Sequence, residues 1–519
     1  MNGVQILLII GAGIGVSALA HRRGLQPGLI VVVLAAGVSF IPGVPRLELE
    51  SELMLAIVVP PLLYSATRGA SFSGFGQNFR AIYNLGVLLV VLTAGALGML
   101  SSWLLPSIGL AAAFVLGAVL APPDTITTVT HGEELGLPRR VTTILTGESL
   151  VNDATALTLF SIAVAAVNGA HTGWGSGIGE FFRTAGTGVG IGALLAVATL
   201  WVRKRLHNST LETALVLLVP FTAFLLAEQV HGSGIIAVVV AAFSISVNTS
   251  LDPQHQYPGA YRTRLQEEAF WPVVDFLLET FVFAYIGLQL KFVLEDLAAD
   301  EEIGLTRTLV AAGVLLLAAI VLRLVGVFGL FGRWQLRERM NKAKLARDPD
   351  LLHRLQERRD RRPGRRRNRG PQVTLGPPTA RENLVVGWTG MRGILTLAAA
   401  ASVPELTDKA EPFPGRDAIQ AIALIVTLGT LLIQGTTIRR LIGWLRLDTA
   451  AERAEAQAMR ARGVEIAKAA VPETRTDEDY EKQRAALSLA VRDGEVDEDT
   501  ARDLIGEIDL RQAAGHTTP

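Results

Sequence analysis

The sequence places acidic and polar side chains inside an apolar stretch near residue 150. Asp153 follows Asn152, and Ser149 lies one helical turn before the aspartate, so the three side chains share neighbouring stripes of a helix. A charged side chain in the middle of a bilayer costs about 2.5–3.5 kcal/mol on insertion scales. Asp153 therefore marks either a structural ion pair or a site that binds something charged.

A lone buried carboxylate can hold a proton or a monovalent cation, because desolvation disfavours its bare charge. Hard cations such as Na⁺ and Li⁺ suit oxygen ligands. The predicted site for transported cation and proton consists of Asp153, Ser149, Pro123, Asp124 and Thr125, with backbone carbonyls near Pro123 as further ligands. Because the two ions compete for one carboxylate, each must leave before the other binds.

The segment that carries Asp124 is interrupted by two prolines. Pro122 and Pro123 lie within the apolar run 110–130. Proline removes a backbone donor and clashes with the preceding turn, so two in succession should open the helix into two half-helices around Asp124. A simple proline kink, with Asp124 bonded to the free amides, is the alternative.

A second interruption is predicted in the apolar run 382–403, where three glycines between residues 387 and 393 surround Arg392. Arg392 needs a buried acid. Glu148 is the preferred partner, because this pair would leave Asp153 free to titrate; a pair between Arg392 and Asp153 is the alternative. Paired interrupted helices in corresponding halves of a chain indicate a transporter binding site.

The composition is that of a polytopic membrane protein. Half of the 519 residues are hydrophobic, 18% are charged and the formal net charge is zero, with a mean hydropathy of +0.38. The chain contains no cysteine, which excludes disulfides and thiolate metal sites. We expect membrane lipid as a partner, no nucleic acid, no cofactor and no enzymatic activity.

Thirteen membrane spans are predicted, and the interrupted ones are the fifth and the twelfth. Because an offset of seven reverses direction, the halves would be inverted repeats. The first span is expected to be a membrane helix; a cleaved leader is the alternative. The spans are approximately 4–20, 28–42, 51–66, 82–105, 110–130, 141–168, 179–202, 211–229, 233–248, 268–290, 305–332, 382–403 and 417–442.

The charges of the loops predict the orientation. Basic residues follow every odd-numbered span, and the loops after the even-numbered spans are neutral or acidic. The loop 333–381 is the extreme case, with 16 Lys or Arg against 5 Asp or Glu. The positive-inside rule then places the N-terminus outside and the C-terminus in the cytoplasm of a multi-pass protein of the cell inner membrane.

Hydrophobicity ends near residue 447, so we expect a transmembrane domain over 1–447 and a cytoplasmic helical tail over 448–519. The tail is acidic, with 17 Asp or Glu against 10 Lys or Arg. Two short helices, 484–492 and 500–510, are predicted around a turn at Asp493-Gly494. The tail is either a solvated appendix or a regulatory or dimer-contacting element attracted to the basic loop.

At these residues the chain resembles the sodium/proton exchangers of the cation–proton antiporter superfamily, in the bacterial branch with an Asn-Asp pair. The motifs are Gly147–Ala154, the break at Pro123-Asp124 and Gly390–Gly393. The resemblance, which covers about residues 1–447, implies a homodimer with a mobile core of helices 82–168 and 305–442. It also implies ion binding at Asp153, a Glu148–Arg392 pair, Asn152 as structural support, and electroneutral exchange.

Two features depart from the resemblance. Pro123 precedes Asp124, whereas the family often has the proline after the acid, so the carbonyl that faces the ion is in question. After the prolines of span 3, Tyr64 and Ser65 occupy the place where many members carry an acid. Affinity or the preference between Na⁺ and K⁺ can therefore differ.

Several other acidic and basic residues can be interpreted either as structural or as functional. Asp275 and Glu279 either line a cytoplasmic funnel or pair with a basic neighbour, and Arg323 is expected to snorkel to the cytoplasmic surface. The predicted function is alternating-access antiport of Na⁺, Li⁺ or K⁺ against H⁺. A K⁺-preferring antiporter and a cation channel are the alternatives, although a channel calls for a continuous pore.

Overall fold

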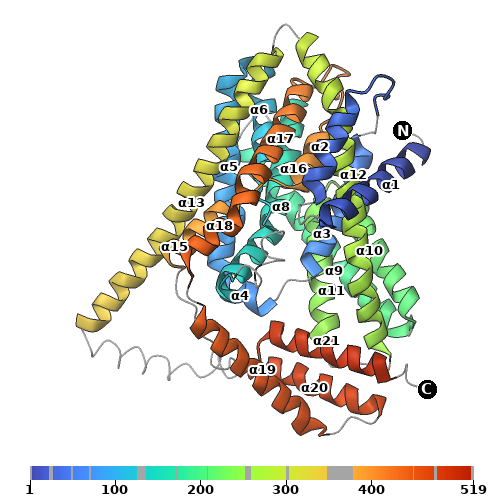
Figure 1. Cartoon of the computed structure of the whole chain (residues 1–519), viewed down its shortest axis with the longest axis vertical. Coiled ribbons are helices and arrows are strands. Elements are labelled where there is room, and N and C mark those ends of the chain that lie inside the picture. Colours follow the sequence, from blue (N-terminus) through green and yellow to red (C-terminus); the bar gives the residue numbers. More distant parts are fainter. Residues whose placement is uncertain are drawn as a thin grey trace.

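The computed structural model describes residues 3–22, 27–47, 51–68, 72–125, 132, 136–169, 174–206, 208–251, 259–299, 303–347, 378–447, 449–472 and 476–515. A large helical bundle carries a small group of helices at one end (Figure 1). We call the end of the bundle next to that small group the tail side and the opposite end the far side.

Long apolar helices dominate the bundle and confirm the all-α membrane class. Seven described segments have the length and composition to cross a membrane. Five are α8 (Arg139–Val167), α9 (Trp174–Leu206), α10 (Ser209–Gln229), α12 (Ala260–Ala299) and α13 (Leu305–Arg347). The other two contain a π-helical stretch: α4 (Phe72–Tyr83), η1 (Asn84–Leu89) and α5 (Val90–Leu104) form one, and α17 (Arg416–Thr430), η4 (Leu431–Gly435) and α18 (Thr436–Leu445) form the other.

Shorter apolar helices account for the remaining predicted spans. They are α1 (Gly3–Arg22), α2 (Pro27–Ser39), α3 (Ser51–Arg68), α6 (Gly109–Leu120, after the short η2 Pro106–Ile108) and α11 (Gly234–Leu251). The pair α15 (Ala380–Trp388) and α16 (Ile394–Ala401) replaces the twelfth predicted span. Every predicted span overlaps a described helix, and the count of thirteen membrane crossings stays a prediction.

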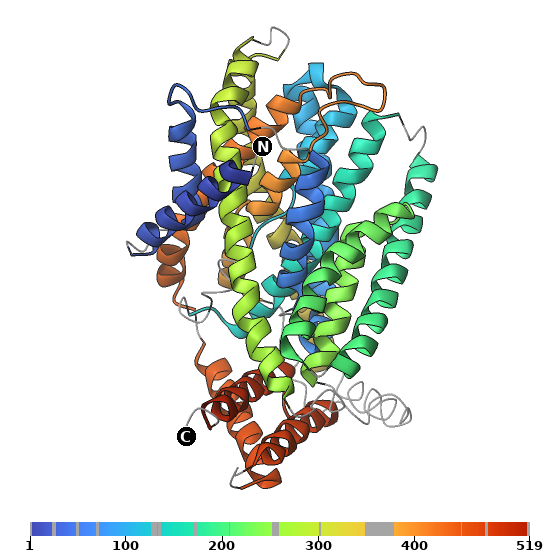
Figure 2. The ribbon, with the colours of Figure 1, turned by 90° about the vertical axis from the view of Figure 1, so that its right-hand side faces the viewer.

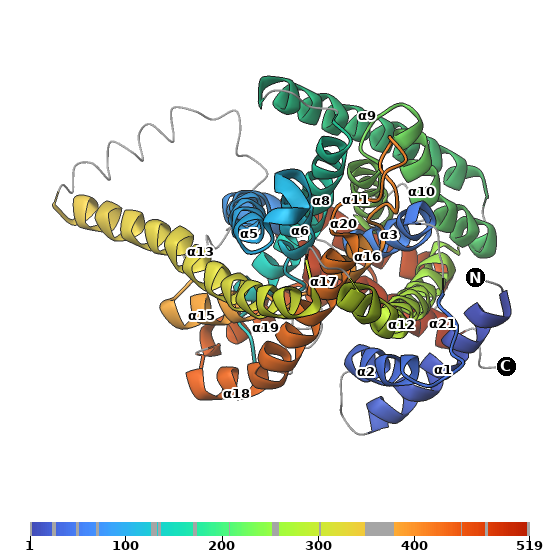
Figure 3. The same cartoon turned by 90° about the horizontal axis from the view of Figure 1, so that it is seen from above.

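The helices fall into two groups when the bundle is seen from above (Figure 3). Group one contains α4, α5, α6, α8, α13 and α15–α18, and group two contains α1–α3 and α9–α12. Within group one, α5 and α6 touch through their backbones: a Cβ on Gly117 would lie 2.3 Å from the carbonyl oxygen of Ala94. Within group two, a Cβ on Gly287 of α12 would lie 2.7 Å from the carbonyl oxygen of Val32 in α2. Small residues therefore permit close helix contacts in both groups.

Three helices form the small group on the tail side, where α12 reaches down to them (Figure 2). They are α19 (Ala450–Ala470), α20 (Asp477–Asp493) and α21 (Glu498–Gly515), which we call the tail helices. Their apolar core includes Leu487, Leu504 and Ile508. Gly494 has a φ of 77° and ends α20, which confirms the predicted turn.

Two features of this end of the chain differ from the prediction. Helix α19 was not predicted, because its sequence is rich in alanine and charged residues and shows no apolar run. Helix α13 continues to Arg347, so the predicted loop 333–381 begins inside a helix. Most of that basic loop, residues 348–377, lies outside the described residues.

Candidate functional site

Asp153 lies in the middle of α8, in the interior of the bundle. Its exposed fraction is 6%, that of Ser149 is 7%, and Asn152 and Glu148 are fully buried. All four side chains come from less than two turns of the same helix, as the sequence predicted. Helix α8 therefore presents two carboxyl groups, Glu148 and Asp153, and two neutral polar groups, Ser149 and Asn152, within the same short stretch.

The first predicted interruption is present on the N-terminal side of Asp124. Helix α6 ends at Leu120, and the described residues 121–125 are not α-helical. Asn152 fixes this segment, because its Nδ2 donates a hydrogen bond to the carbonyl oxygen of Pro123 at 2.6 Å. The predicted second half-helix falls in residues 126–131, outside the described part of the chain.

The second predicted interruption separates α15 from α16 and meets the first. The backbone N–H of Asp124 donates to the carbonyl oxygen of Met391 at 2.6 Å, and the two residues form an isolated antiparallel bridge. The break after α6 and the break between α15 and α16 are thus joined by a backbone hydrogen bond, although they are far apart in the sequence. Irregular backbone at membrane depth is tolerated where it is buried in protein, and Met391 is 2% exposed.

The glycines on both sides of Arg392 make room for charged side chains. A Cβ on Gly393 would lie 1.8 Å from Oδ2 of Asp124. A Cβ on Gly390 would lie 2.8 Å from Cγ of Arg323. The Gly-Met-Arg-Gly motif is therefore explained by the close approach of one carboxylate and one guanidinium.

The predicted pair between Glu148 and Arg392 was wrong, because Arg323 of α13 takes that place. Arg323 Nη2 donates to Oε2 of Glu148 at 2.8 Å, and Nη1 contacts Oε1 of the same carboxylate. Both residues are buried, with exposed fractions of 2% and 0%. The predicted snorkelling of Arg323 was also wrong. Two parallel N–H···O contacts make this a bidentate ion pair inside group one.

Arg392 is satisfied by backbone carbonyls and not by a carboxylate bond in the described structure. Its Nε donates to the carbonyl oxygen of Leu120 at 2.9 Å, and its Nη1 donates to that of Gly390 at 2.6 Å. Its backbone N–H donates to Oγ1 of Thr430 at 3.0 Å, at the start of the π-helical stretch η4. The guanidinium thus joins the last turn of α6 to the break between α15 and α16, where helix-end carbonyls carry partial negative charge.

Neither guanidinium is therefore used by Asp153, and the alternative Arg392–Asp153 pair has no support among the described contacts. In the described part of the chain, no hydrogen bond reaches the Asp153 carboxylate. Asp124 is near enough for the two carboxylates to interact electrostatically. Asp124 is only partly buried, whereas Asp153 is almost completely buried. Asp153 and Asp124 therefore lie near each other. The neighbouring guanidiniums are bonded to other groups: Arg323 to Glu148, and Arg392 to backbone carbonyls.

Two of the other predicted ligands have structural contacts. The carbonyl oxygen of Pro123 accepts the hydrogen bond from Asn152, and the hydroxyl of Thr125 donates to the carbonyl oxygen of Leu145 at 3.2 Å. These contacts fasten the open segment to α8. Asn152 therefore connects α8 to the open segment, and Ser149 is one turn from Asp153 on α8; the roles predicted for these residues at the ion site stay predictions.

The acids of α12 face α3 and α2 across group two. The hydroxyl of Ser65 donates to Oδ2 of Asp275 at 2.5 Å. Oε1 of Glu279 would lie 3.2 Å from a Cβ on Gly28 of α2. Glu279 is exposed, and its charge interacts with those of Asp275 and Asp124. Ser65, at the place where an acid is missing from span 3, is thus bonded to an acid from another helix.

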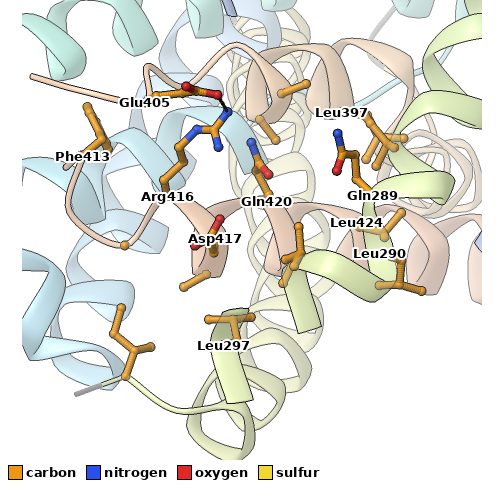
Figure 4. A pocket seen from close by; sticks show the side chains of 18 of the residues that line it. Gln289, Leu290, Leu297, Leu397, Glu405, Phe413, Arg416, Asp417, Gln420 and Leu424 are labelled. Atoms are coloured by element: carbon orange, nitrogen blue, oxygen red, sulfur yellow. Dashed lines mark hydrogen bonds and ion pairs between the residues drawn. The ribbon is translucent and has the colours of Figure 1, made fainter. Parts of the chain in front are cut away.

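A cavity that the sequence did not predict opens between the two groups of helices. Its volume is about 630 Å³, and its walls come from α12 in group two and from α16 and α17 in group one. Figure 4 shows Arg416 and Glu405 paired at one end of this cavity, with their side chains 3.4 Å apart, and Gln420 nearby. Leu397 and Leu424 provide apolar parts of the wall. The two groups are therefore separated by open space on the far side.

The sequence did contain a signal for Arg323. Nine residues separate it from the end of the predicted span 305–332, which is about 14 Å of helix. That distance exceeds the reach of an arginine side chain, so burial with a partner was the better interpretation. The π-helical stretches had no recognisable signal. In η1, a Cβ on Gly86 would lie 2.9 Å from Cβ of Val151, so this stretch packs directly on α8.

The chain matches the family model described as sodium/hydrogen exchanger, transmembrane, over residues 5–444. An uncharacterized Na⁺/H⁺ exchanger of Mycobacterium tuberculosis (strain H37Rv) is 31% identical over 477 residues, which cover 90% of this chain and 79% of the relative. The Na⁺/H⁺ antiporter ApNhaP of Aphanothece halophytica is 25% identical over 86% of this chain and 75% of its own length.

The fold is similar to that of a solved structure. The sodium proton antiporter MjNhaP1 of Methanocaldococcus jannaschii, at pH 8, matches with a TM-score of 0.60. The match covers 85% of this chain and 97% of the solved chain, at 15% sequence identity. At that identity the likeness concerns the arrangement of the helices.

Proposed function

Because the chain belongs to the sodium/hydrogen exchanger family, we propose that it is a secondary antiporter that exchanges Na⁺, Li⁺ or K⁺ for H⁺ at Asp153. One observation carries the proposal: a buried aspartate lies where two interrupted helices meet, while the two neighbouring guanidiniums are bonded to Glu148 and to backbone carbonyls. The Na⁺/H⁺ antiporter relatives support the same activity.

At this site one carboxylate serves both ions. When Asp153 is protonated, it has no charge to offer a cation; when a cation binds, it takes the place of the proton. The Ser149 hydroxyl and the Asp124 carboxylate are the nearest additional oxygen ligands that we assign, and Asn152 holds the Pro123–Thr125 segment in position. Because Arg323 neutralises Glu148, that pair carries no net charge, and one cation exchanges for one proton without net charge movement.

Alternating access requires that Asp153 face the two sides of the membrane in turn. We assign group one, which corresponds to the predicted core of helices 82–168 and 305–442, as the mobile part of a transport domain over 1–447. Group two would be the scaffold and the contact between the subunits of a homodimer. The cavity between α12 and α16–α17 supports a division between these groups. The tail side is assigned to the cytoplasm of the inner membrane.

Exchange can be measured in proteoliposomes with an imposed pH gradient and a pH-sensitive dye. Asp153→Asn should abolish dye dequenching on addition of Na⁺, because the amide can neither release a proton nor neutralise a cation. Asp408→Asn is the matched control, since this aspartate is exposed in the loop between α16 and α17. Full exchange by Asp153→Asn would contradict the proposal.

The same assay with a series of cations separates the remaining alternatives. Competition at one carboxylate predicts a bell-shaped pH profile, because protons displace the cation at low pH and are scarce at high pH. Raising the cation concentration should move the optimum to lower pH. The cation with the highest apparent affinity identifies the substrate, and slow, saturable flux supports a carrier. Single-channel currents would contradict the antiporter.

A further inference from the structure

The tail helices contact both groups of membrane helices. A segment in this position can control how far one group moves against the other. We propose that α19–α21 act as a brake on exchange by holding group one and group two in one relative position. The inference rests on the proposed function, because it requires movement between the groups. It is argued from one buried ion pair on group two and from a set of attachments on group one.

The contact with group two is a bidentate ion pair at the tail-side end of α12. Arg264 donates from Nε to Oδ2 of Asp509 at 2.7 Å and from Nη2 to Oδ1 at 2.9 Å. Asp509 lies in α21, and only 2% of its side chain is exposed. The same carboxylate accepts a hydrogen bond from Nε of Arg484 in α20 at 2.7 Å. One buried carboxylate therefore binds a membrane helix and a tail helix together.

The contact with group one is covalent and polar. Helix α19 begins at Ala450, soon after α18 ends at Leu445, so the tail helices follow α18 directly. Glu452 of α19 lies 3.4 Å from Arg140 at the start of α8, and Arg140 also pairs with Glu382 of α15 at 2.5 Å. The tail helices are thus attached to α18 and α8 of group one, and Arg140 connects α8 in turn to α15.

The two polar contacts differ in strength. Burial raises the pKa of Glu452 above its usual value, and the nearby Arg140 lowers that pKa less than burial raises it. A carboxyl group whose charged form is disfavoured contributes a weak ion pair. Asp509, by contrast, receives three charge-assisted hydrogen bonds from two guanidiniums. The Arg264–Asp509 pair is therefore the contact that limits movement between the tail helices and group two.

A rigid connection between the groups would slow any displacement of one against the other. The tail helices have an apolar core of their own, so they move as a unit. In Figures 1 and 3 they extend beneath the bundle from the side of α15 and α18 to the side of α12. When group one moves, the buried Arg264–Asp509 pair must be separated, and separation of a buried pair is costly.

The first test removes the contact with group two and leaves the tail helices intact. Arg264→Gln should raise the maximal rate of Na⁺-driven proton exchange by about five-fold or more, the lower range of allosteric coupling. Asp509 keeps its bond to Arg484 in this variant. Arg460→Gln is the matched control, because the Arg460–Glu507 pair joins α19 to α21 and touches neither group. An unchanged or reduced rate in Arg264→Gln would overturn the brake.

The second test restores the connection covalently and uses the natural absence of cysteine. Arg262 of α12 and Asp477 of α20 are exposed, and their charges interact across the same contact. Arg262→Cys combined with Asp477→Cys should lose at least about ten-fold in exchange rate when joined by a short thiol cross-linker, and cleavage of the linker should restore the rate. The two single-cysteine variants are the controls. Full exchange by the cross-linked protein would overturn the brake.

These results separate failure of the brake from failure of the exchanger. If the wild-type protein exchanges Na⁺ for H⁺ but neither Arg264→Gln nor the cross-link changes the rate, the brake alone is wrong. If the wild-type protein shows no cation-dependent proton flux, the proposed function is wrong, and the brake falls with it. Asp153→Asn should be inactive both alone and combined with Arg264→Gln.

Discussion

Two buried arginines of group one are stabilised in different ways. Arg323 is paired with a carboxylate, Glu148, whereas Arg392 is surrounded by the carbonyl oxygens of Leu120 and Gly390. The first arrangement cancels a charge. The second leaves a net positive charge and uses it to fasten two helix breaks.

The difference explains how a free aspartate is retained between two cations. Arg323 is directed at Glu148 and not at Asp153: Nη1 and Nη2 contact the Glu148 carboxylate, and Nη2 also donates to the carbonyl oxygen of Val386. Among the described contacts, only its buried Nε has no hydrogen-bond partner. Arg392 is held by the ends of interrupted helices, whose carbonyls have no partner within their own helix. The helix breaks therefore provide the ligands that keep Arg392 in place.

The largest effect expected from this comparison is the loss of Glu148. Glu148→Ala leaves Arg323 as an uncompensated buried charge and should lower the free energy of unfolding by about 3–5 kcal/mol. Thermal unfolding of the detergent-purified protein would measure the change. A Glu148–Arg392 pair, as predicted from the sequence, would give the same loss in Glu148→Ala alone. Variants that also remove one of the two arginines are therefore needed to identify the partner.

Combining Glu148→Ala with Arg323→Met should recover most of the lost stability, because both members of the pair are then removed. Combining Glu148→Ala with Arg392→Met should give additive losses. Recovery by Arg392→Met and not by Arg323→Met would contradict the ion pair that the structure shows.

A smaller loss is expected for Arg392→Met than for Arg323→Met. Removing Arg392 leaves neutral carbonyls without donors, at about 1–3 kcal/mol for an unsatisfied buried group. Removing Arg323 leaves the charge of Glu148 buried without a partner, which costs about 3–5 kcal/mol. Both variants can be compared in one thermal-unfolding series. Equal losses would mean that Arg392 also neutralises a carboxylate.

Much of this arrangement could be predicted from residue types. Proline and glycine have strong local effects, so the breaks after Leu120 and after Trp388 were predicted close to their observed positions. The polar stripe of α8 followed from helical periodicity alone. The tail turn at Gly494 was predictable because glycine readily adopts a positive φ.

The partners of the arginines could not be predicted in the same way. A sequence shows that a buried guanidinium needs acceptors, but a carbonyl that is free because a helix is broken leaves no sign in the residue types. Glu148 was a reasonable partner for Arg392, because the carbonyl of Leu120 becomes available only once α6 ends. Arg323 was misjudged from its place in an apolar span, and contacts with α8 across the bundle decide its role.

The glycines beside Arg392 allow the comparison to be tested without changing a charge. Gly393→Ala places a methyl group 1.8 Å from the Asp124 carboxylate, so the break must widen. Overpacking of this kind costs about 1–3 kcal/mol, and the exchange rate should fall at least ten-fold. Gly390→Ala is the matched variant, because its methyl group would press on Arg323 and not on Asp124. A milder loss of exchange is expected for Gly390→Ala, and the reverse order would contradict the assignment of Asp124 to the site.

The smallest effect is expected from the hydroxyl that connects Arg392 to the π-helical stretch η4. The Thr430 hydroxyl oxygen accepts a hydrogen bond from the backbone N–H of Arg392 at 3.0 Å. The same hydroxyl donates a hydrogen bond to the carbonyl oxygen of Thr427 at 3.0 Å. Thr430→Val keeps the shape and removes both bonds, which should lower stability by about 1 kcal/mol.

Thr436→Val is the control for this change, because the exposed Thr436 hydroxyl donates to the carbonyl oxygen of Leu432, one turn earlier in η4, and the variant leaves the bond between Thr430 and the Arg392 backbone in place. If the backbone around Arg392 is held chiefly by the guanidinium, Thr430→Val should leave the pH optimum of exchange unchanged while it lowers the unfolding temperature. A shift of the optimum would mean that η4 helps to set the position of the break next to Asp124. The comparison of the two arginines would then have to include the helix that supports one of them.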